Sequence, residues 1–325
     1  MKKIFIKLVF FFMVTGCTQG GGDGRGSLAD PLPSWADGPT KQAIVAFVKQ
    51  VTDSGGAGFI PVAERIATFD NDGTLWAEKP LVQELFAIYR VKKMVARDPG
   101  LAKVQPYKAI VENDKDYFVK GGEKALVQLV AATHTGMTED EFEKSVADFF
   151  SQAIVNGRPV RQTVYQPQLE LLDYLRTNGF NIYICTGGTV DVVRGISLPL
   201  YGIPKERVIG TNFKYQFSDS TGQLMRMPEL DHFNDKSGKP AAIQLHIGRR
   251  PVFACGNEGG EGDIEMLQFS QGSSYPSFQL LINHDDSARE FYYQEKGNES
   301  LHAALEGHWH VVSMRNDWKT VYPEK

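Results

Sequence analysis

The stretch Phe69-Asp70-Asn71-Asp72-Gly73-Thr74-Leu75 is the most informative part of this sequence, because it joins an apolar run to a polar loop. With the preceding Ile66-Ala67-Thr68 it predicts a short buried strand followed by a turn that Gly73 permits. Two carboxylates two residues apart after such a strand can point into one pocket, one as nucleophile and one as proton donor. The alternatives are an Asx-type turn and a calcium loop. An EF-hand loop needs a Glu at its twelfth position, where this sequence has Leu81.

Strand-like and helix-like segments alternate along the rest of the chain, which predicts an α/β fold with a parallel sheet and helices on both faces. We expect further strands at 180–185, 251–255 and 278–282, a hairpin in 207–234 around Gly222, and an extended pair, Trp309–Met314 and Trp318–Tyr322. We expect helices at 40–52, 167–179, 240–246 and 263–269.

The block 81–160 has helical patterns and no convincing strand, and Thr138 with Glu141 forms a capping-box pattern inside it. Because it lies between the first two expected strands, we expect an inserted helical cap at 80–160. The core then comprises 38–79 and 161–325.

Three further loops carry polar residues, and ligands of open α/β sheets bind outside the carboxyl ends of the strands. Thr186-Gly187-Gly188 follows the strand 180–185 and offers a hydroxyl and backbone amides to phosphate oxygens. The segment Lys236-Ser237-Gly238-Lys239-Pro240 places a lysine at a helix start. The loop 256–263, GNEGGEGD, carries oxygen ligands that suit Mg²⁺.

Together these loops resemble the four motifs of the haloacid dehalogenase-like phosphohydrolases, nearest the phosphoserine-phosphatase-like branch. Asp70–Thr74 matches the specific first motif DxDGT, and the other three loops follow in the family's order within roughly residues 60–285. The resemblance implies a Rossmann-like parallel-sheet core with an inserted α-helical cap. It also implies hydrolysis of a small-molecule phosphomonoester with Mg²⁺ as cofactor.

The resemblance also implies a role for each motif residue. Asp70 attacks phosphorus and becomes an aspartyl-phosphate, while Asp72 protonates the leaving oxygen and then activates water. Thr186, Gly187 and the lysine of the third motif hold phosphoryl oxygens. Mg²⁺ lies between Asp70, the backbone carbonyl of Asp72 and the acidic loop.

Two features depart from the family pattern. Glu261 occupies the fifth position after Gly256, where the fourth motif usually has Asp, and Asp263 is at the seventh. We interpret this as a two-residue insertion, which leaves Asp263, Glu261 and Asn257 as candidate metal ligands and Glu258 as a further alternative. For the third motif we favour Lys239, because Pro240 suits the first position of a helix, and Lys236 is the alternative.

The first 16 residues, MKKIFIKLVFFFMVTG, have the basic start and short apolar run of a signal peptide. Val14-Thr15-Gly16-Cys17 resembles a bacterial lipobox, which predicts lipidation at Cys17 and a flexible linker over 17–37. Thr18 in place of Asp favours an outer-membrane lipoprotein facing the periplasm, anchored through its N-terminal lipid.

The composition is that of a globular protein, with 42% hydrophobic and 23% charged residues and a net charge of −4. A weakly acidic chain without a basic block argues against nucleic acid as a partner. Three cysteines exclude a disulfide scaffold, and Cys185 and Cys255 are either small buried side chains or a disulfide pair.

Residues beside the motifs are weaker candidates. Trp76 and Glu78 either meet the leaving group or pack at the cap boundary. His284-Asp285-Asp286 lies past the strand 278–282 and either caps a turn or supports the site, and Asp286 with Arg289 fits an i, i+3 pair.

The sequence therefore predicts a lipid-anchored phosphatase. The alternatives are a phosphotransferase of the same fold, in which an alcohol accepts the phosphoryl group, and a non-catalytic binding lipoprotein. A dehalogenase is disfavoured because Asp72 supplies an acid that dehalogenation does not need.

Overall fold

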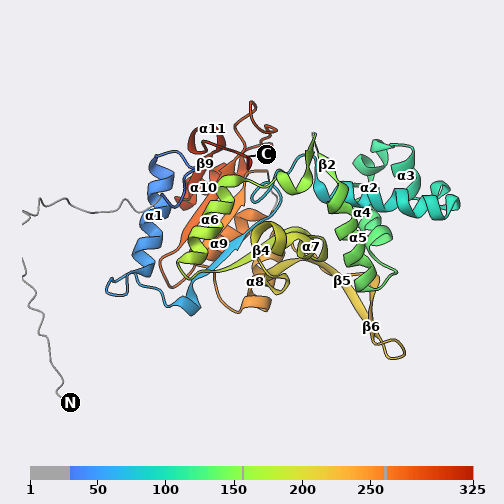
Figure 1. Cartoon of the computed structure of the whole chain (residues 1–325), viewed down its shortest axis with the longest axis horizontal. Helices are drawn as coiled ribbons and strands as arrows, with labels where there is room; N and C mark the ends of the chain where they lie inside the picture. The colour runs from blue at the N-terminus through green and yellow to red at the C-terminus, as the bar shows by residue number, and fades with distance from the viewer. Residues whose placement is uncertain (1–29, 156, 260–261, 325) are drawn as a thin grey trace, which may run out of the picture. The chain divides into compact units, whose positions relative to one another are not determined.

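A seven-stranded sheet organises the chain (Figure 1). The computed structural model describes residues 30–155, 157–259 and 262–324, and its packed unit begins at Pro31. The strand order is β6-β5-β4-β1-β7-β8-β9, and every pairing is parallel except that of β5 with the edge strand β6. The strands are β1 Ile66–Phe69, β4 Asn181–Thr189, β5 Val208–Ser218, β6 Gln223–His232, β7 Phe253–Asn257, β8 Phe278–Asn283 and β9 His310–Ser313.

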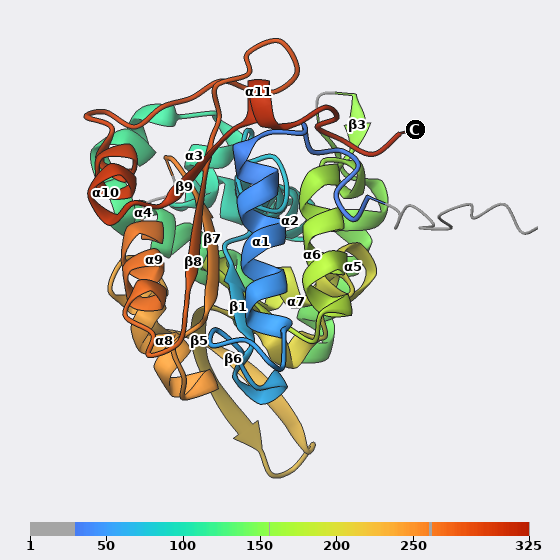
Figure 2. The same cartoon turned by 90° about the vertical axis from the view of Figure 1, so that its left-hand side faces the viewer.

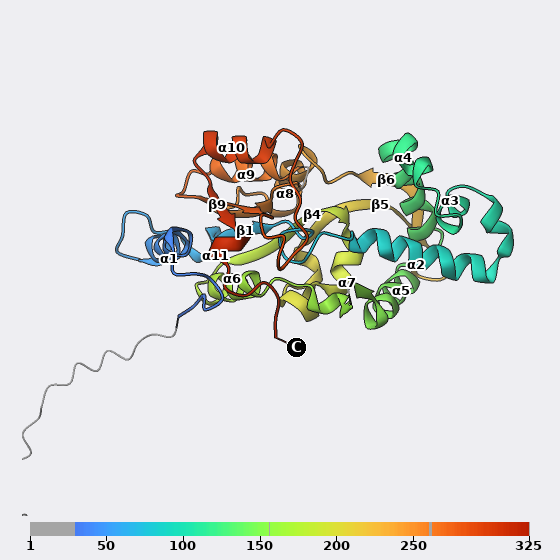
Figure 3. The same ribbon diagram turned by 90° about the horizontal axis from the view of Figure 1, so that it is seen from above.

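Helices cover both faces of this sheet, as the alternating pattern predicts (Figures 2 and 3). One face carries α1 Pro39–Thr52, α6 Gln166–Thr177 and α7 Val190–Tyr201; the other carries α8 Gly238–Ile247, α9 Asp263–Gln271 and α10 Glu299–Gly307. The short helix α11 Met314–Asp317 follows β9. The predicted mixed α/β architecture is therefore confirmed.

The register of β1 brings the motif loops together. Phe69 pairs with Ile184 of β4 on one side and with Cys255 of β7 on the other. Because these three strands are parallel and adjacent, the loops after them leave the same edge of the sheet. Asp70, Thr186 and Asn257 therefore lie at one edge of the sheet although they are far apart in the sequence.

The insertion between β1 and β4 contains four α-helices and a small two-stranded ribbon (Figure 1). The helices are α2 Val82–Arg97, α3 Tyr107–Val111, α4 Lys115–His134 and α5 Glu139–Gln152, and the ribbon pairs β2 Ile154–Val155 with β3 Arg158–Pro159. Gly122, with φ of +52°, interrupts α4. The capping box of Thr138 and Glu141 at the start of α5 is confirmed. We expected no strand here, and the ribbon is too short for a sequence pattern to reveal.

The hairpin of β5 and β6 also contacts the insertion. Its turn contains Gly222 at φ +66°, as the sequence predicts. The Arg226 guanidinium on β6 donates to the His134 carbonyl at the end of α4 and to the Glu139 carboxylate in α5. Hydrogen bonds from β6 to α4 and α5 therefore hold the insertion against the sheet, in addition to the chain connections at its two ends.

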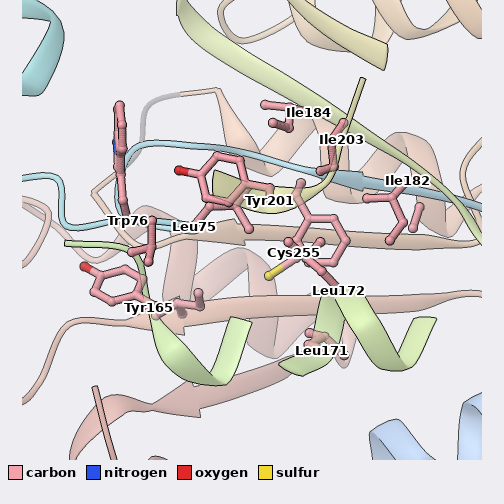
Figure 4. Close-up of a cluster of buried hydrophobic side chains, with 14 of the residues drawn as sticks. Leu75, Trp76, Tyr165, Leu171, Leu172, Ile182, Ile184, Tyr201, Ile203 and Cys255 are labelled. Carbon is pink, nitrogen blue, oxygen red and sulfur yellow. The ribbon is translucent and has the colours of Figure 1, made fainter. Parts of the chain in front are cut away.

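The core beneath the motif loops is apolar (Figure 4). Figure 4 shows side chains from α6, β4 and the segments around them; the labelled residues are Leu75, Trp76, Tyr165, Leu171, Leu172, Ile182, Ile184, Tyr201, Ile203 and Cys255. Both Cys185 and Cys255 are buried and free, so the interpretation as small buried side chains is confirmed.

Two expectations need correction at the ends of the described chain. Leu32 and Trp35 are fully buried, and Trp35 contacts Trp318 edge to face with ring centroids 6.0 Å apart. The linker predicted over 17–37 is therefore too long, because packing begins at Pro31. Of the extended pair, β9 forms as expected, but Trp318–Tyr322 is no strand, and Trp318 makes one isolated bridge, to Trp35.

The predicted signal peptide, the lipidation residue Cys17 and the candidate ligand Glu261 lie outside the described residues. Within the described ranges, no helix combines the length and the apolar character that crossing a membrane requires.

Candidate active site

The centre of the site is a buried lysine between two buried aspartates. Lys239 Nζ lies 2.7 Å from Asp70 Oδ1 and 2.5 Å from Asp263 Oδ1. Burial opposes the charged form of Lys239, but Asp263 and Asp70 outweigh it and raise its pKa. The ammonium group therefore stays protonated and holds the two carboxylates side by side.

The start of α8 explains why Lys239 rather than Lys236 reaches this position. The helix begins at Gly238, whose N–H donates to the Asp235 carbonyl, so Lys239 falls in the first turn and its side chain is buried. Pro240 occupies the third helical position, two residues later than expected, where its missing N–H still costs no helical hydrogen bond. Lys236 is exposed, with φ of +49°.

Asp263 is the first residue of α9 and is fully buried. Its Oδ2 accepts the backbone N–H of Asn257 at 2.9 Å, which joins the two ends of the acidic loop. The side chain of Asn257 accepts from Thr74 Oγ1 at 3.2 Å and donates to Tyr293 Oη at 3.1 Å. Asn257 thus connects neighbouring loops, while the Asp263 carboxylate faces Lys239.

Asp72 lies beside Asp70 and is partly exposed to a cavity. Trp76 Nε1 donates to Asp72 Oδ1 at 2.8 Å, and the Gly73 N–H donates to the Trp76 carbonyl at 2.9 Å. Burial and the neighbouring Asp70 raise the pKa of Asp72 to about 6. A carboxyl of that pKa can exist in both protonation states near neutral pH, which suits an acid that later acts as a base.

Thr186, Gly187 and Gly188 line the same cavity at the end of β4. Thr186 Oγ1 accepts the Gly188 N–H at 3.0 Å, and the Gly187 carbonyl accepts from Thr211 Oγ1 at 2.6 Å. These residues do not form the expected loop after a strand that ends at residue 185, because β4 runs to Thr189 with a register shift between Thr186 and Thr189. The two bonds hold this irregular end of the strand in one shape. The predicted second motif is therefore at the site.

Gln83 in the first turn of α2 is a site residue that the sequence did not reveal. Its Oε1 accepts the Thr189 N–H at 2.7 Å, and its buried Nε2 has no hydrogen-bond partner among the residues that the structure describes. A Cβ at Gly188 would lie 1.7 Å from Nε2, so a side chain at this position would have to displace the Gln83 amide. An unused buried donor beside the second motif is available to a ligand oxygen.

Supporting residues surround the first motif. His284 Nε2 contacts the Gly73 carbonyl at 2.9 Å, and its ring stacks on Tyr293 at a centroid distance of 4.3 Å. Glu78 is buried. Its Oε2 lies 3.4 Å from Asn257 Nδ2, and its Oε1 lies 2.7 Å from Lys79 Nζ. His284 and Glu78 are thus near the site.

Asp285 and Asp286 bond elsewhere. Asp286 pairs with Arg289, and Asp285 accepts from Ser313 and the Arg315 backbone.

The charge balance of the site fits a bound divalent cation. Lys239 binds the Asp70 and Asp263 carboxylates, Asp72 adds a third carboxyl beside them, and burial raises the pKa of Asp70 and of Asp263 even though Lys239 opposes the rise. Excess negative charge, carboxylate oxygens and a backbone carbonyl are what Mg²⁺ prefers, with waters completing its shell. Across the described parts of the chain, no cluster of three or more His, Cys, Asp or Glu side chains is arranged to hold a metal by itself. Of the expected ligands, the side chains of Asp70 and Asp263 and the Asp72 carbonyl belong to this site. The Asn257 side chain is bonded to Thr74 and Tyr293, and Glu261 lies outside the described residues.

A cavity of about 380 Å³ connects these residues to the cap. Asp70, Asp72, Thr186 and Lys239 line one end of it, and residues of α2 and α4 line the other. This arrangement can hold a small molecule with one end against the carboxylates and the other against the cap.

Comparisons with solved structures agree with this fold. A conserved functionally unknown protein from Anaerococcus prevotii DSM 20548 is 14% identical, with a TM-score of 0.56 over 86% of this chain and 94% of that chain. A protein of unknown function from Bordetella pertussis Tohama I is 14% identical, with a TM-score of 0.50 over 77% of this chain and 99% of that chain. A phosphoserine phosphohydrolase-like protein from Francisella tularensis subsp. tularensis SCHU S4 is 17% identical, with a TM-score of 0.41 over 76% and 94%. Identities this low speak to the fold alone, and only the first two scores support it.

No curated protein matches the sequence. The family model described as haloacid dehalogenase-like hydrolase matches residues 67–268, more than half of the chain. The matched stretch runs from β1 into α9 and contains Asp70, Thr186, Lys239 and Asp263. This chain belongs to the haloacid dehalogenase-like hydrolases.

Proposed function

We propose that this hydrolase is a Mg²⁺-dependent phosphatase that cleaves phosphomonoesters through a phosphorylated Asp70. The observation that carries the proposal is the contact of Asp70 with Lys239 at 2.7 Å, with Asp72 on the wall of the same cavity. A buried nucleophile beside a fixed cation, with a second carboxyl of raised pKa next to it, suits phosphoryl transfer. Positioning and charge neutralisation carry most of the catalysis in that chemistry.

The reaction has two steps. In the first, an Asp70 oxygen attacks phosphorus, the P–O bond to the alcohol breaks, and protonated Asp72 gives its proton to the leaving oxygen. In the second, Asp72 removes a proton from water as the water oxygen attacks phosphorus. The Asp70–phosphorus bond breaks and inorganic phosphate forms.

The other residues stabilise charge during both steps. The Lys239 ammonium neutralises charge on the phosphoryl oxygens, which Thr186 and the Gly187 amide also bind. Asp70, the Asp72 carbonyl and Asp263 would hold Mg²⁺, which when bound neutralises further phosphoryl charge. Trp76 keeps the Asp72 carboxyl oriented toward the cavity through the bond to its Oδ1.

The decisive test is a panel of phosphomonoesters, each measured with Mg²⁺ and with a chelator. We expect phosphate release that requires Mg²⁺, and we expect Asp70→Asn to lower kcat by about 10³-fold or more because the nucleophile is lost. The isosteric change leaves packing intact, so the thermal unfolding midpoint checks the fold. Wild-type turnover by Asp70→Asn would exclude the aspartyl-phosphate mechanism.

A Mg²⁺ titration of activity separates the candidate metal ligands. We expect Asp263→Asn to raise the Mg²⁺ concentration for half-maximal activity, because Asp263 is buried beside Asp70. Glu261→Gln will produce the same shift only if that side chain also binds the metal. If neither variant shifts the titration, Asn257 and Glu258 become the candidates.

We further propose that the mature protein is anchored by lipid at Cys17 in the outer membrane and faces the periplasm. The support is the sequence Val14-Thr15-Gly16-Cys17 after a basic, apolar start. We expect Cys17→Ser to remove the lipid, so that the protein is released from membranes without detergent. Membrane association equal to that of the wild type would contradict this proposal.

A further inference from the structure

Most of the side chains that line the cap end of the active-site cavity are apolar. Leu126, Leu129 and Val130 of α4 line it, and Phe213 of β5, Leu230 of β6 and Phe233 just after β6 line the facing side. Two separate parts of the chain, the inserted helices and the hairpin, therefore present apolar side chains to the same space. A leaving group bound with its oxygen at Asp72 would extend into this space.

Some of these side chains are unusually exposed for their size. Leu126 is 50% exposed and Phe233 is 39% exposed. Exposed apolar side chains that gather around a cavity are typical of a binding site for an apolar group, because the bound group removes their surface from water.

The charged groups on the cavity wall exclude a second anion on the substrate. Among the described residues that line it, Lys239 is the one Lys or Arg, and Asp70 and Asp263 already bind its ammonium group. Glu84 and Glu123 also line the cavity, as does Glu78, whose carboxylate is paired with Lys79. A carboxylate or second phosphate in the cap end would lose water without gaining a cationic partner, and it would be repelled by the glutamates.

His134, also on the wall, offers no positive charge. Burial and the nearby Arg226 and Arg90 lower the pKa of its imidazole to about 3, so it is neutral at physiological pH.

We propose that the substrate is a phosphate monoester of an apolar alcohol or phenol without a second anionic group. This rests on the proposed phosphatase function. It disfavours phosphorylated amino acids and nucleoside diphosphates, because both carry an additional anion beyond the scissile ester.

Two ester series test the proposal on the wild-type enzyme. In linear alkyl phosphates we expect kcat/KM to rise by about 4-fold for each added methylene, the factor that corresponds to ~0.8 kcal/mol per buried CH₂, until the cavity is filled. Phenyl phosphate and 4-carboxyphenyl phosphate differ by one distal carboxylate, and we expect phenyl phosphate to be the better substrate by at least about 10-fold. A flat alkyl series, or a preference for the carboxylated ester, overturns the proposal.

A pair of variants in α4 tests whether the wall of the cavity contacts the leaving group. Val130→Lys places an ammonium group in the cap end, so we expect the preference between the two phenyl esters to shift by at least about 10-fold toward the carboxylated one. Val119→Lys is the control, because Val119 lies in the part of α4 before the interruption at Gly122, is 79% exposed and is not on the cavity wall. If Val130→Lys folds and leaves the preference unchanged, the proposal is wrong. If it does not fold, the wild-type series decides.

The outcomes separate this proposal from the function on which it rests. If no phosphomonoester in the panel is hydrolysed, the phosphatase function fails. Binding of hexyl phosphate and of phosphoserine to the Asp70→Asn variant, measured by calorimetry, then still tests the cavity. We expect hexyl phosphate to bind at least about 10-fold more tightly than phosphoserine, and equal affinities overturn the substrate class alone.

Discussion

Trp76 and Asp72 are joined by a hydrogen bond of 2.8 Å from the indole Nε1 to Oδ1 of the carboxylate. The indole is fully buried and stacks on Phe150 of α5 with ring centroids 5.9 Å apart. The orientation of the proposed general acid therefore depends on a side chain that packs against the cap. A shift of α5 relative to the sheet would therefore move Trp76 and change the orientation of the Asp72 carboxyl.

We expect Trp76→Phe to lower kcat by roughly 10-fold, since a hydrogen bond to a charged group contributes about 1.5–3 kcal/mol. The bond from Trp76 lowers the pKa of Asp72, so its loss raises that pKa. The pH–rate limb that reports Asp72 should then move to higher pH. The measurement is the pH profile of kcat in both proteins.

Trp35→Phe is the matched control. Trp35 is also fully buried, and its Nε1 donates to the Pro167 carbonyl at 2.9 Å, on another part of the fold. It should lower the unfolding midpoint without moving the pH profile. If both variants move the profile equally, the Trp76 bond has no particular effect on Asp72.

Local patterns predicted the motif loops because their residues directly follow strands, and adjacent parallel strands bring those loops to one edge. Contacts between segments that are far apart in the sequence cannot be predicted from such local patterns. The bond of Gln83 to Thr189 spans 106 residues, and Gln83 is one polar residue among several on an amphipathic helix. Arg226 is an arginine on an edge strand, where a charged side chain is usually exposed, yet it is buried against the cap. Tyr293 lies outside regular secondary structure, so periodicity could not identify it.

Gln83 gives the second prediction. Gln83→Leu keeps the volume but removes both the acceptor for the Thr189 N–H and the unpaired Nε2 donor. We expect the inhibition constant of inorganic phosphate and the KM of a good substrate to rise by roughly 5- to 10-fold, because the Nε2 donor to a phosphate oxygen is lost and the second motif loses its bond to Gln83.

Gln128→Leu controls for the substitution itself. Gln128 is on α4, and its side-chain bond, to Tyr117, is exposed. Phosphate affinity should not change in this variant. Wild-type phosphate affinity in a folded Gln83→Leu protein would show that the amide does not contribute to phosphate binding.

The two candidate lysines give the third prediction. Lys239→Met leaves Asp70 and Asp263 buried without their shared cation, and we expect kcat to fall by about 100-fold or more together with a lower unfolding midpoint. Lys236→Met changes an exposed side chain, so kcat should stay within about 2-fold of the wild type. Activity and thermal unfolding of both variants check this. Equal losses in the two would contradict the assignment of Lys239 to the third motif.

The fourth prediction concerns Asp191, which links α7 to the hairpin. Its Oδ2 accepts from Arg226 at 2.5 Å and from Tyr215 Oη at 2.6 Å, while its Oδ1 accepts from Arg194 at 2.9 Å. Burial favours the neutral acid, but these partners outweigh it and lower the pKa of Asp191. The ionised carboxylate therefore stabilises the folded state at every pH at which Asp191 is also ionised in the unfolded chain.

The lowered pKa of Asp191 determines how the free energy of unfolding depends on pH. A carboxyl whose pKa is lowered by folding contributes its full stability above the unfolded value of about 3.9, and it loses that stability as pH falls through the lower folded value. We expect Asp191→Asn to lower the free energy of unfolding by about 3 kcal/mol at about pH 7, because Arg226 loses a buried partner. The difference from the wild type should stay constant down to about pH 4 and shrink below it.

Asp173→Asn provides the comparison, because Asp173 also pairs with an arginine three residues later, Arg176, but is 75% exposed. That variant should change the free energy of unfolding by less than about 1 kcal/mol. Denaturant unfolding of the wild type and both variants across pH gives the two differences. If the Asp191→Asn difference is small at neutral pH, or does not shrink in acid, then the ionised carboxylate is not what ties the hairpin to α7. Packing of Arg226 over Phe142, at 4.0 Å from the ring centroid, would then be the main contact that holds hairpin and cap together.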